Sequence, residues 1–149
     1  MNDLYLKIKT QNDLDELLVL KKMLENLPKY RAILIREKFK ENFSPFKEVQ
    51  IWKDNVVYFN KLIIGDFNFA IDVSCYIDKY IVSFFDRNAE NNKTALMFIG
   101  KVDMGLEARE GSSRLFKVFK YPEEEGALFD FLEKLKNAIL KNVSNSELM

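Results

Sequence analysis

The chain has 149 residues, of which 48% are hydrophobic and 31% are charged, and its 23 basic side chains balance 23 acidic ones. This composition is typical of a single globular domain, and the zero formal charge argues against a general attraction to nucleic acid or to anionic membranes. The chain contains no histidine and one cysteine, which excludes histidine-based catalytic triads, histidine-ligated zinc, four-cysteine zinc sites and paired-cysteine redox motifs.

The N-terminal part of the chain predicts one short strand and two helices. Apolar and polar residues alternate over residues 4–8, which indicates a strand or an extended lead-in. Leucines spaced three and four apart over residues 14–27 predict an amphipathic helix. Pro28 disfavours helical geometry in the residue before it, so we expect that helix to end there and a second helix to occupy residues 28–43. The two helices would then form an αα-hairpin.

The centre of the chain predicts an antiparallel hairpin. Residues 67–77 alternate strictly between apolar and mainly polar side chains, and residues 80–85 form a second run rich in β-forming residues. A two-residue loop at 78–79 would place Cys75 opposite Val82 on an apolar inner face. We therefore expect the single cysteine to be a buried structural thiol.

The remaining segments predict further strands and one last helix. Residues 49–59 indicate another hairpin, and the nearly continuous apolar run at 94–102 indicates a strand covered on both faces. Residues 103–114 are expected to form a loop and residues 115–121 the last strand. A proline and three glutamates then open an amphipathic helix over residues 121–141.

The predicted fold is α+β. Two N-terminal helices and one C-terminal helix pack on an antiparallel meander sheet of five to six strands. Residues 1–141 form this single domain, and residues 142–149 are expected to be a frayed tail without the helical periodicity.

Carboxylates on or beside the predicted strands are the candidates for catalytic chemistry. Asp66, Asp72 and Asp86 have the residue type that a Mg²⁺-dependent nuclease or its degenerate relative uses to hold the ion. The ordinary interpretation is that these carboxylates lie in solvated strand faces and turns. We expect no cofactor, no metal and no enzymatic activity, and keep the metal site as an alternative.

Aromatic residues are the candidates for binding. The chain has 13 Phe, 6 Tyr and 1 Trp, more than one inner sheet face requires. Trp52, Tyr58, Asp72, Tyr76 and Ile81 are expected on the opposite sheet face, where exposed aromatics beside charged groups are typical of a protein-binding patch. Alternatively, helices cover both sheet faces, or the aromatics line the pocket of a carrier of small apolar ligands.

These observations favour a small cytoplasmic protein-binding module. The expected function is inhibition of the bacterial immunity or antitoxin type, in which the sheet face blocks a cognate protein toxin by direct contact. Lysine outnumbers arginine by 18 to 5, which does not favour nucleic acid as the partner. The chain has no run of about 20 apolar residues, so we expect no membrane span.

Overall fold

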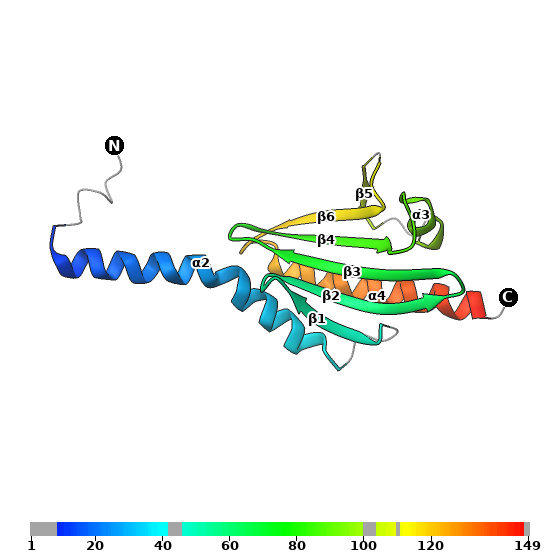
Figure 1. Ribbon diagram of the computed structural model, residues 1–149, viewed down its shortest axis with the longest axis horizontal. Helices are drawn as coiled ribbons and strands as arrows, with labels where there is room; N and C mark the ends of the chain where they lie inside the picture. Colours follow the sequence, from blue (N-terminus) through cyan, green and yellow to red (C-terminus); the bar gives the residue numbers. More distant parts are fainter. Residues whose placement is uncertain (1–8, 42–45, 100–103, 110, 148–149) are drawn as a thin grey trace.

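A six-stranded antiparallel sheet with helices on one side forms the centre of the molecule (Figure 1). The computed structural model describes residues 9–41, 46–99, 104–109 and 111–147. The elements are α2 Gln11–Phe39, β1 Glu48–Trp52, β2 Val56–Ile64, β3 Phe67–Cys75, β4 Lys79–Asp86, α3 Lys93–Ile99, β5 Glu107–Ala108, β6 Arg114–Lys120 and α4 Glu125–Glu147. The predicted α+β class is confirmed, and the strand order is β1-β2-β3-β4-β6-β5.

The central hairpin of β3 and β4 forms as predicted, but its predicted register is wrong. Cys75 lies opposite Tyr80 rather than Val82, and Asp72 lies opposite Ser83. The turn lies one residue earlier than expected: the backbone N–H of Tyr76 bonds the Lys79 carbonyl at 2.9 Å, so residues 77 and 78, rather than 78 and 79, lie between the bonded pair. A slip of two residues leaves every side chain on its original face. The predicted inner and outer faces are therefore preserved.

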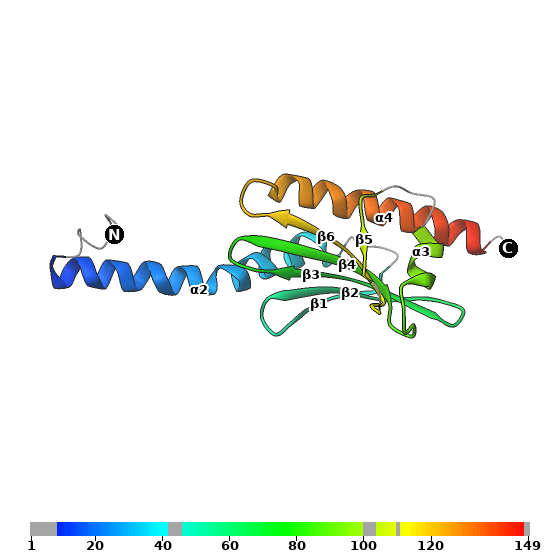
Figure 2. The same cartoon turned by 90° about the horizontal axis from the view of Figure 1, so that it is seen from above.

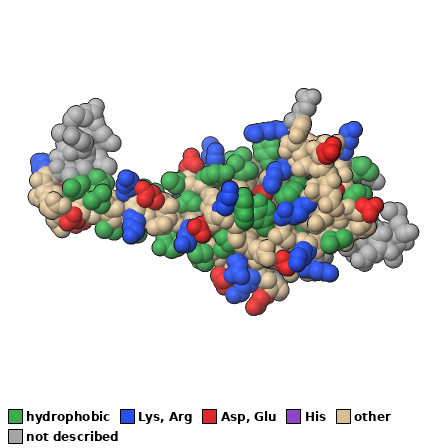
Figure 3. Space-filling view, viewed as in Figure 1, with side chains coloured by type: hydrophobic (Ala, Val, Ile, Leu, Met, Phe, Trp, Pro, Cys, Tyr) green, Lys and Arg blue, Asp and Glu red, His purple; other side chains and the backbone are tan. Residues whose placement is uncertain are grey.

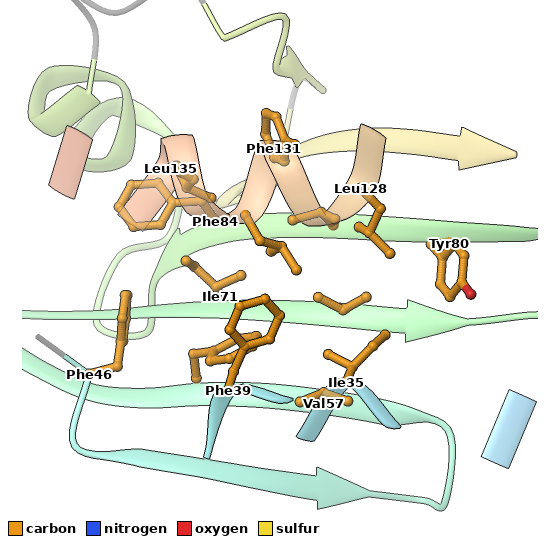
Figure 4. Packing of buried hydrophobic residues seen from close by; sticks show 14 of the residues in the cluster. Ile35, Phe39, Phe46, Val57, Ile71, Tyr80, Phe84, Leu128, Phe131 and Leu135 are labelled. Carbon is orange, nitrogen blue, oxygen red and sulfur yellow. The ribbon is translucent and has the colours of Figure 1, made fainter. Parts of the chain in front are cut away.

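The core lies between one face of this sheet and the helices (Figure 2). Figure 4 shows Ile35 and Phe39 from α2 and Leu128 and Leu135 from α4 close to the strand residues. The α4 residues predicted to form its buried stripe are all buried: Leu128, Phe131, Leu132, Leu135 and Ile139. Burying one such side chain fully contributes about 1.5–3 kcal/mol. This packing fixes one face of the sheet as the covered face.

A polar cluster joins both long helices to the same end of the sheet. Arg31 of α2 donates from Nε to the Tyr80 hydroxyl of β4 at 2.8 Å and forms an ion pair with Glu125 of α4. The Tyr80 hydroxyl donates to Glu125 at 3.2 Å, and the Arg31 guanidinium lies 5.0 Å from the centre of the Tyr121 ring. Burial raises the pKa of Tyr80, although Arg31 opposes the shift. We call Arg31, Tyr80 and Glu125 the helix anchor.

The prediction of two N-terminal helices is wrong, because α2 continues through Pro28. A proline inside a helix costs about 3 kcal/mol. The helix is supported on both sides of it: Thr10 and Asp13 form a capping box at the start, and Ala32, Ile35 and Phe39 are buried after it. Figure 1 shows α2 changing direction in this region and its first half extending beyond the sheet, as expected of a proline-containing helix.

The apolar run predicted to be a strand at 94–102 is instead a helix over its described part, α3. Short apolar runs do not distinguish a buried strand from a helix by periodicity alone. Ala95 and Ile99, four residues apart, are buried, and the centres of the Phe98 and Phe69 rings lie 4.5 Å apart. Near the C-terminal end of α3, the Phe98 carbonyl accepts a hydrogen bond from the Asn142 side chain at 2.7 Å. Tertiary packing against β3 and α4 therefore decides the conformation of this segment.

The ends of the chain differ from expectation in one respect. The expected tail begins at residue 142, whereas α4 continues to Glu147, with Asn142 bonded to α3. The strand predicted at residues 4–8 lies outside the described residues. Among the described helices, none combines the length and apolar character that a bilayer span requires.

The Cys75 thiol provides a test of the inner face. Cys75 is 0% exposed, and burial raises its pKa to about 12. We expect a chromophoric disulfide reagent to leave the native thiol unmodified at about pH 8, since the thiolate is the reactive species. The same reagent should label Cys75 rapidly in urea. Rapid labelling of the folded protein would contradict the burial.

The helix anchor provides a second test, by urea unfolding. Arg31→Met should lower the free energy of unfolding by about 2 kcal/mol, because it leaves a half-buried carboxylate without its partner. Tyr80→Phe removes only hydroxyl hydrogen bonds and should cost about 1 kcal/mol. The matched control is Arg36→Met on the same helix, since Arg36 pairs with Glu37 at the surface, and it should change stability by less than about 0.5 kcal/mol. Equal effects of both arginine substitutions would contradict the role of the anchor.

Candidate functional site

The second face of the sheet is the candidate site. Of the described helices, none packs on it, and Figure 3, which views this face, shows hydrophobic and basic side chains intermixed over the strands. The strand registers place these residues on it: Trp52, Tyr58, Asp72, Ile81, Ser83, Phe85, Arg114, Phe116 and Val118. We call this surface the open face.

An ion pair with a buried carboxylate lies at the middle of the open face. Asp72 is only 3% exposed although no described helix covers it, because the Arg114 guanidinium pairs with its carboxylate. Burial raises the pKa of Asp72, and the charge and hydrogen bond of Arg114 and a hydrogen bond with Ser83 offset part of that shift. The carboxylate therefore positions Arg114 and is not itself available to a partner.

Arginine side chains lie over aromatic rings across the open face. The distances from guanidinium carbon to ring centre are 4.0 Å for Arg114–Phe85, 4.8 Å for Arg109–Phe116, 5.2 Å for Arg87–Tyr58 and 5.4 Å for Arg87–Phe85. Each lies within the range of attraction between a cation and the ring quadrupole. Three of the five arginines of the chain thus lie over aromatic rings of this face, and of these Arg114 is paired with Asp72 while Arg87 and Arg109 are exposed.

The edge of the open face is hollowed beside Trp52. The hollow has a volume of about 310 Å³ and is lined by Gln50, Ile51, Trp52, Tyr58, Asn60 and Arg87. The Trp52 and Tyr58 rings meet edge to face with their centres 6.1 Å apart. Arg87 donates to the Asn60 side chain, and its guanidinium carbon lies 5.2 Å from the centre of the Tyr58 ring. An apolar side chain of a partner would find here one aromatic wall and one cationic wall.

The five residues predicted to bind a partner are brought to one side of the molecule. Trp52 and Tyr76 are 51% and 42% exposed, and Tyr58 and Ile81 are partly buried. Asp72 also belongs to this face, but its burial under Arg114 removes it from the contact surface. The strand registers thus place the predicted residues on one side of the sheet, and their binding of a partner stays a prediction.

The carboxylates of the alternative metal site do not come together. Asp72 lies on the open face, whereas Asp86 lies opposite Phe69 on the covered face. Asp86 accepts hydrogen bonds from the backbone of Asn68 and Asn88, both at 3.0 Å, and so shapes the turn after β4. Asp66 is an exposed residue of the turn between β2 and β3. In the part of the chain that the structure describes, no three acidic or cysteine side chains are grouped to hold a metal ion.

A larger hollow lies between β6 and α4, where the apolar-ligand alternative would place a pocket. Its volume is about 720 Å³, and its lining includes Phe119 and Phe131 together with Lys117, Asp130 and Lys134. The Lys117 ammonium lies over both rings, 5.5 Å and 5.2 Å from their centres. Charged side chains within an exposed lining do not match the mostly apolar, enclosed sites of small-molecule carriers.

Arg87, Arg109 and Arg114 are the residues of the site that the sequence reasoning missed. A partial signal was present, because Arg114, Phe116 and Val118 alternate with residues of the inner face. The contacts of Arg114 with Phe85, of Arg109 with Phe116 and of Arg87 with Tyr58 depend on strand order, which no pattern along the chain contains.

Comparison with protein-family models, with curated proteins and with solved structures found no match. The function is therefore argued from the geometry of this chain.

The pH dependence of stability tests the central ion pair. The raised pKa of Asp72 means that the folded state keeps its proton at pH values where the unfolded chain, with the usual value of 3.8, has lost it. Stability contributed at this position therefore falls as the pH rises above that value. Relative to Asp72→Asn, the wild type should lose free energy of unfolding as the pH rises above 3.8, measured by urea titration at a series of pH values. A relative gain in that pH range would show that Arg114 outweighs burial.

Proposed function

We propose that this protein binds another protein through the open face. The observation that carries the proposal is the one-sided covering of the sheet: helices from both ends of the chain pack on one face, and the other face carries arginines stacked on aromatic rings. Tryptophan, tyrosine and arginine are the residue types that dominate binding energy at protein interfaces.

The chemistry of the open face specifies the kind of partner. Arg87 and Arg109 are exposed, and the aromatic rings beneath them hold the guanidinium groups in place. A guanidinium forms two parallel hydrogen bonds with one carboxylate. The partner is therefore a protein with acidic side chains around an apolar residue, and the apolar residue enters the hollow beside Trp52.

In its specific form, the proposal is an inhibitor of the immunity or antitoxin type. A flat face of aromatic and guanidinium groups suits steric blocking of a cognate toxin, in which the rings supply affinity and the charges steer the encounter. This specific form rests on size, on the single sheet and on the exposed face, and it requires an acidic surface on the toxin.

A single-stranded nucleic acid is the competing ligand for a basic aromatic surface. Two features favour a protein. The rings of Tyr58, Phe85 and Phe116 already carry guanidinium groups and so are not free platforms for bases. Trp52 and Val118 add exposed apolar surface at the strands around them.

Affinity capture with the full chain tests the proposal. Three baits are used in lysate of the source cells: the wild type, Arg87→Glu and Lys141→Glu. Lys141→Glu is the matched control, because it reverses one charge at an exposed position of α4. We expect a stoichiometric protein that the wild type and Lys141→Glu retain and that Arg87→Glu binds at least about tenfold more weakly.

Two results would overturn the proposal. One is that no captured protein distinguishes Arg87→Glu from Lys141→Glu. The other is that a fluorescent single-stranded oligonucleotide, and no protein, binds the wild type and is released by Arg87→Glu. For the inhibitor form, the captured protein must also be a toxin whose activity falls in proportion to added wild-type chain.

A further inference from the structure

The first half of α2 forms an arm that extends beyond the sheet (Figures 1 and 2). Six apolar side chains of this arm are between 38% and 59% exposed: Leu14, Leu18, Val19, Leu20, Met23 and Leu24. An isolated helix of this length is marginal in water, and most helical stability comes from packing of an apolar face. The arm thus has the sequence of a packed helix without a packing partner among the described residues.

Four leucines of the arm form a regular stripe. Leu17, Leu20, Leu24 and Leu27 are spaced three, four and three residues apart, which is the spacing of the core positions of two coiled-coil heptads. Leu17 and Leu24 are separated by seven residues, and Arg31 follows after seven more. Because Arg31 is the α2 residue of the helix anchor, the stripe continues the side of α2 that is already an interface. We call these four residues the leucine stripe.

We propose that the leucine stripe pairs with the same stripe of a second copy, in an antiparallel two-helix coiled coil. Leu17 and Leu27 lie equally far along the chain from Lys22, and so do Leu20 and Leu24. A twofold axis at Lys22 therefore sets Leu17 opposite Leu27 of the second copy and Leu20 opposite its Leu24. The stripe is complementary to itself, which is the requirement for a closed symmetric dimer.

The charges beside the stripe are paired within each helix, because Lys21 and Glu25 form an ion pair at 3.8 Å. The antiparallel direction sends the two sheets to opposite ends of the coiled coil, which leaves both open faces accessible. A parallel pair would bring the two sheets to the same end.

Sedimentation velocity of the full chain tests the dimer over about a hundredfold range of concentration, since a reversible dimer dissociates on dilution. We expect the wild type to reach twice the monomer mass, and Leu20→Glu and Leu24→Glu to remain monomeric throughout. The matched control is Val19→Glu, which places the same charge on another side of the arm and should still dimerise. Circular dichroism should show all four proteins folded, because the arm lies outside the core.

A monomeric wild type would overturn the proposal and would leave the stripe to a different protein or to the chain itself. A dimer that survives Leu24→Glu, or that is lost equally in Val19→Glu, would overturn it as well. These results are independent of the open face, since Arg87→Glu should leave the dimer intact.

Cysteine cross-linking tests the direction of the helices. Leu17→Cys and Leu27→Cys chains are mixed and oxidised, and the linked peptides are identified by mass spectrometry. The antiparallel pair predicts disulfides between position 17 of one chain and position 27 of the other. Two copies of position 17 would be ten residues apart along the helix, or about 15 Å, too far for a disulfide. Dominant links between two copies of position 17 would show a parallel pair and overturn the arrangement.

Discussion

The attachment of both long helices to one sheet face is the constraint on which the rest of this structure depends. Arg31, Tyr80 and Glu125 connect α2, β4 and α4 through two hydrogen bonds and an ion pair at one end of the sheet. Beyond this anchor, Ile35 and Leu128 bury the helices against the strands. Charged groups that are half-buried must remain paired, so the anchor fixes where α2 reaches the sheet and where it leaves.

Two exposed surfaces follow from that attachment. Because both helices cover one face, the other face keeps its side chains accessible, and Arg114 rather than a helix shields Asp72. Because α2 is held from Arg31 onward, its first half extends away from the domain, and Leu14, Leu18, Leu20 and Leu24 are exposed on it. The two surfaces differ in chemistry: one is flat, aromatic and cationic, and the other is a narrow aliphatic stripe. Each therefore suits a different kind of contact.

The candidate site was partly predictable from the sequence. Alternation along single strands placed Trp52, Tyr58, Asp72 and Ile81 on one face, because that property depends only on the twofold periodicity of a strand. Alternation along single strands did not reveal that Arg114 buries the Asp72 carboxylate, because this contact joins residues 42 positions apart. The antiparallel register decides which side chains touch, and the turn after Cys75 shifted that register by two residues.

The sequence by itself determined the α+β class, the inner faces of the strands and the buried stripe of α4, because each follows from a repeat within one element. Tertiary structure alone decided that α2 continues through Pro28, that residues 93–99 are helical and that three arginines gather on the open face. For the apolar run and the arginines, the deciding free energy comes from contacts between elements distant in the chain, and local propensity is weaker than that packing. For α2, the capping box before Pro28 and the burial of Ala32, Ile35 and Phe39 after it support the continuous helix.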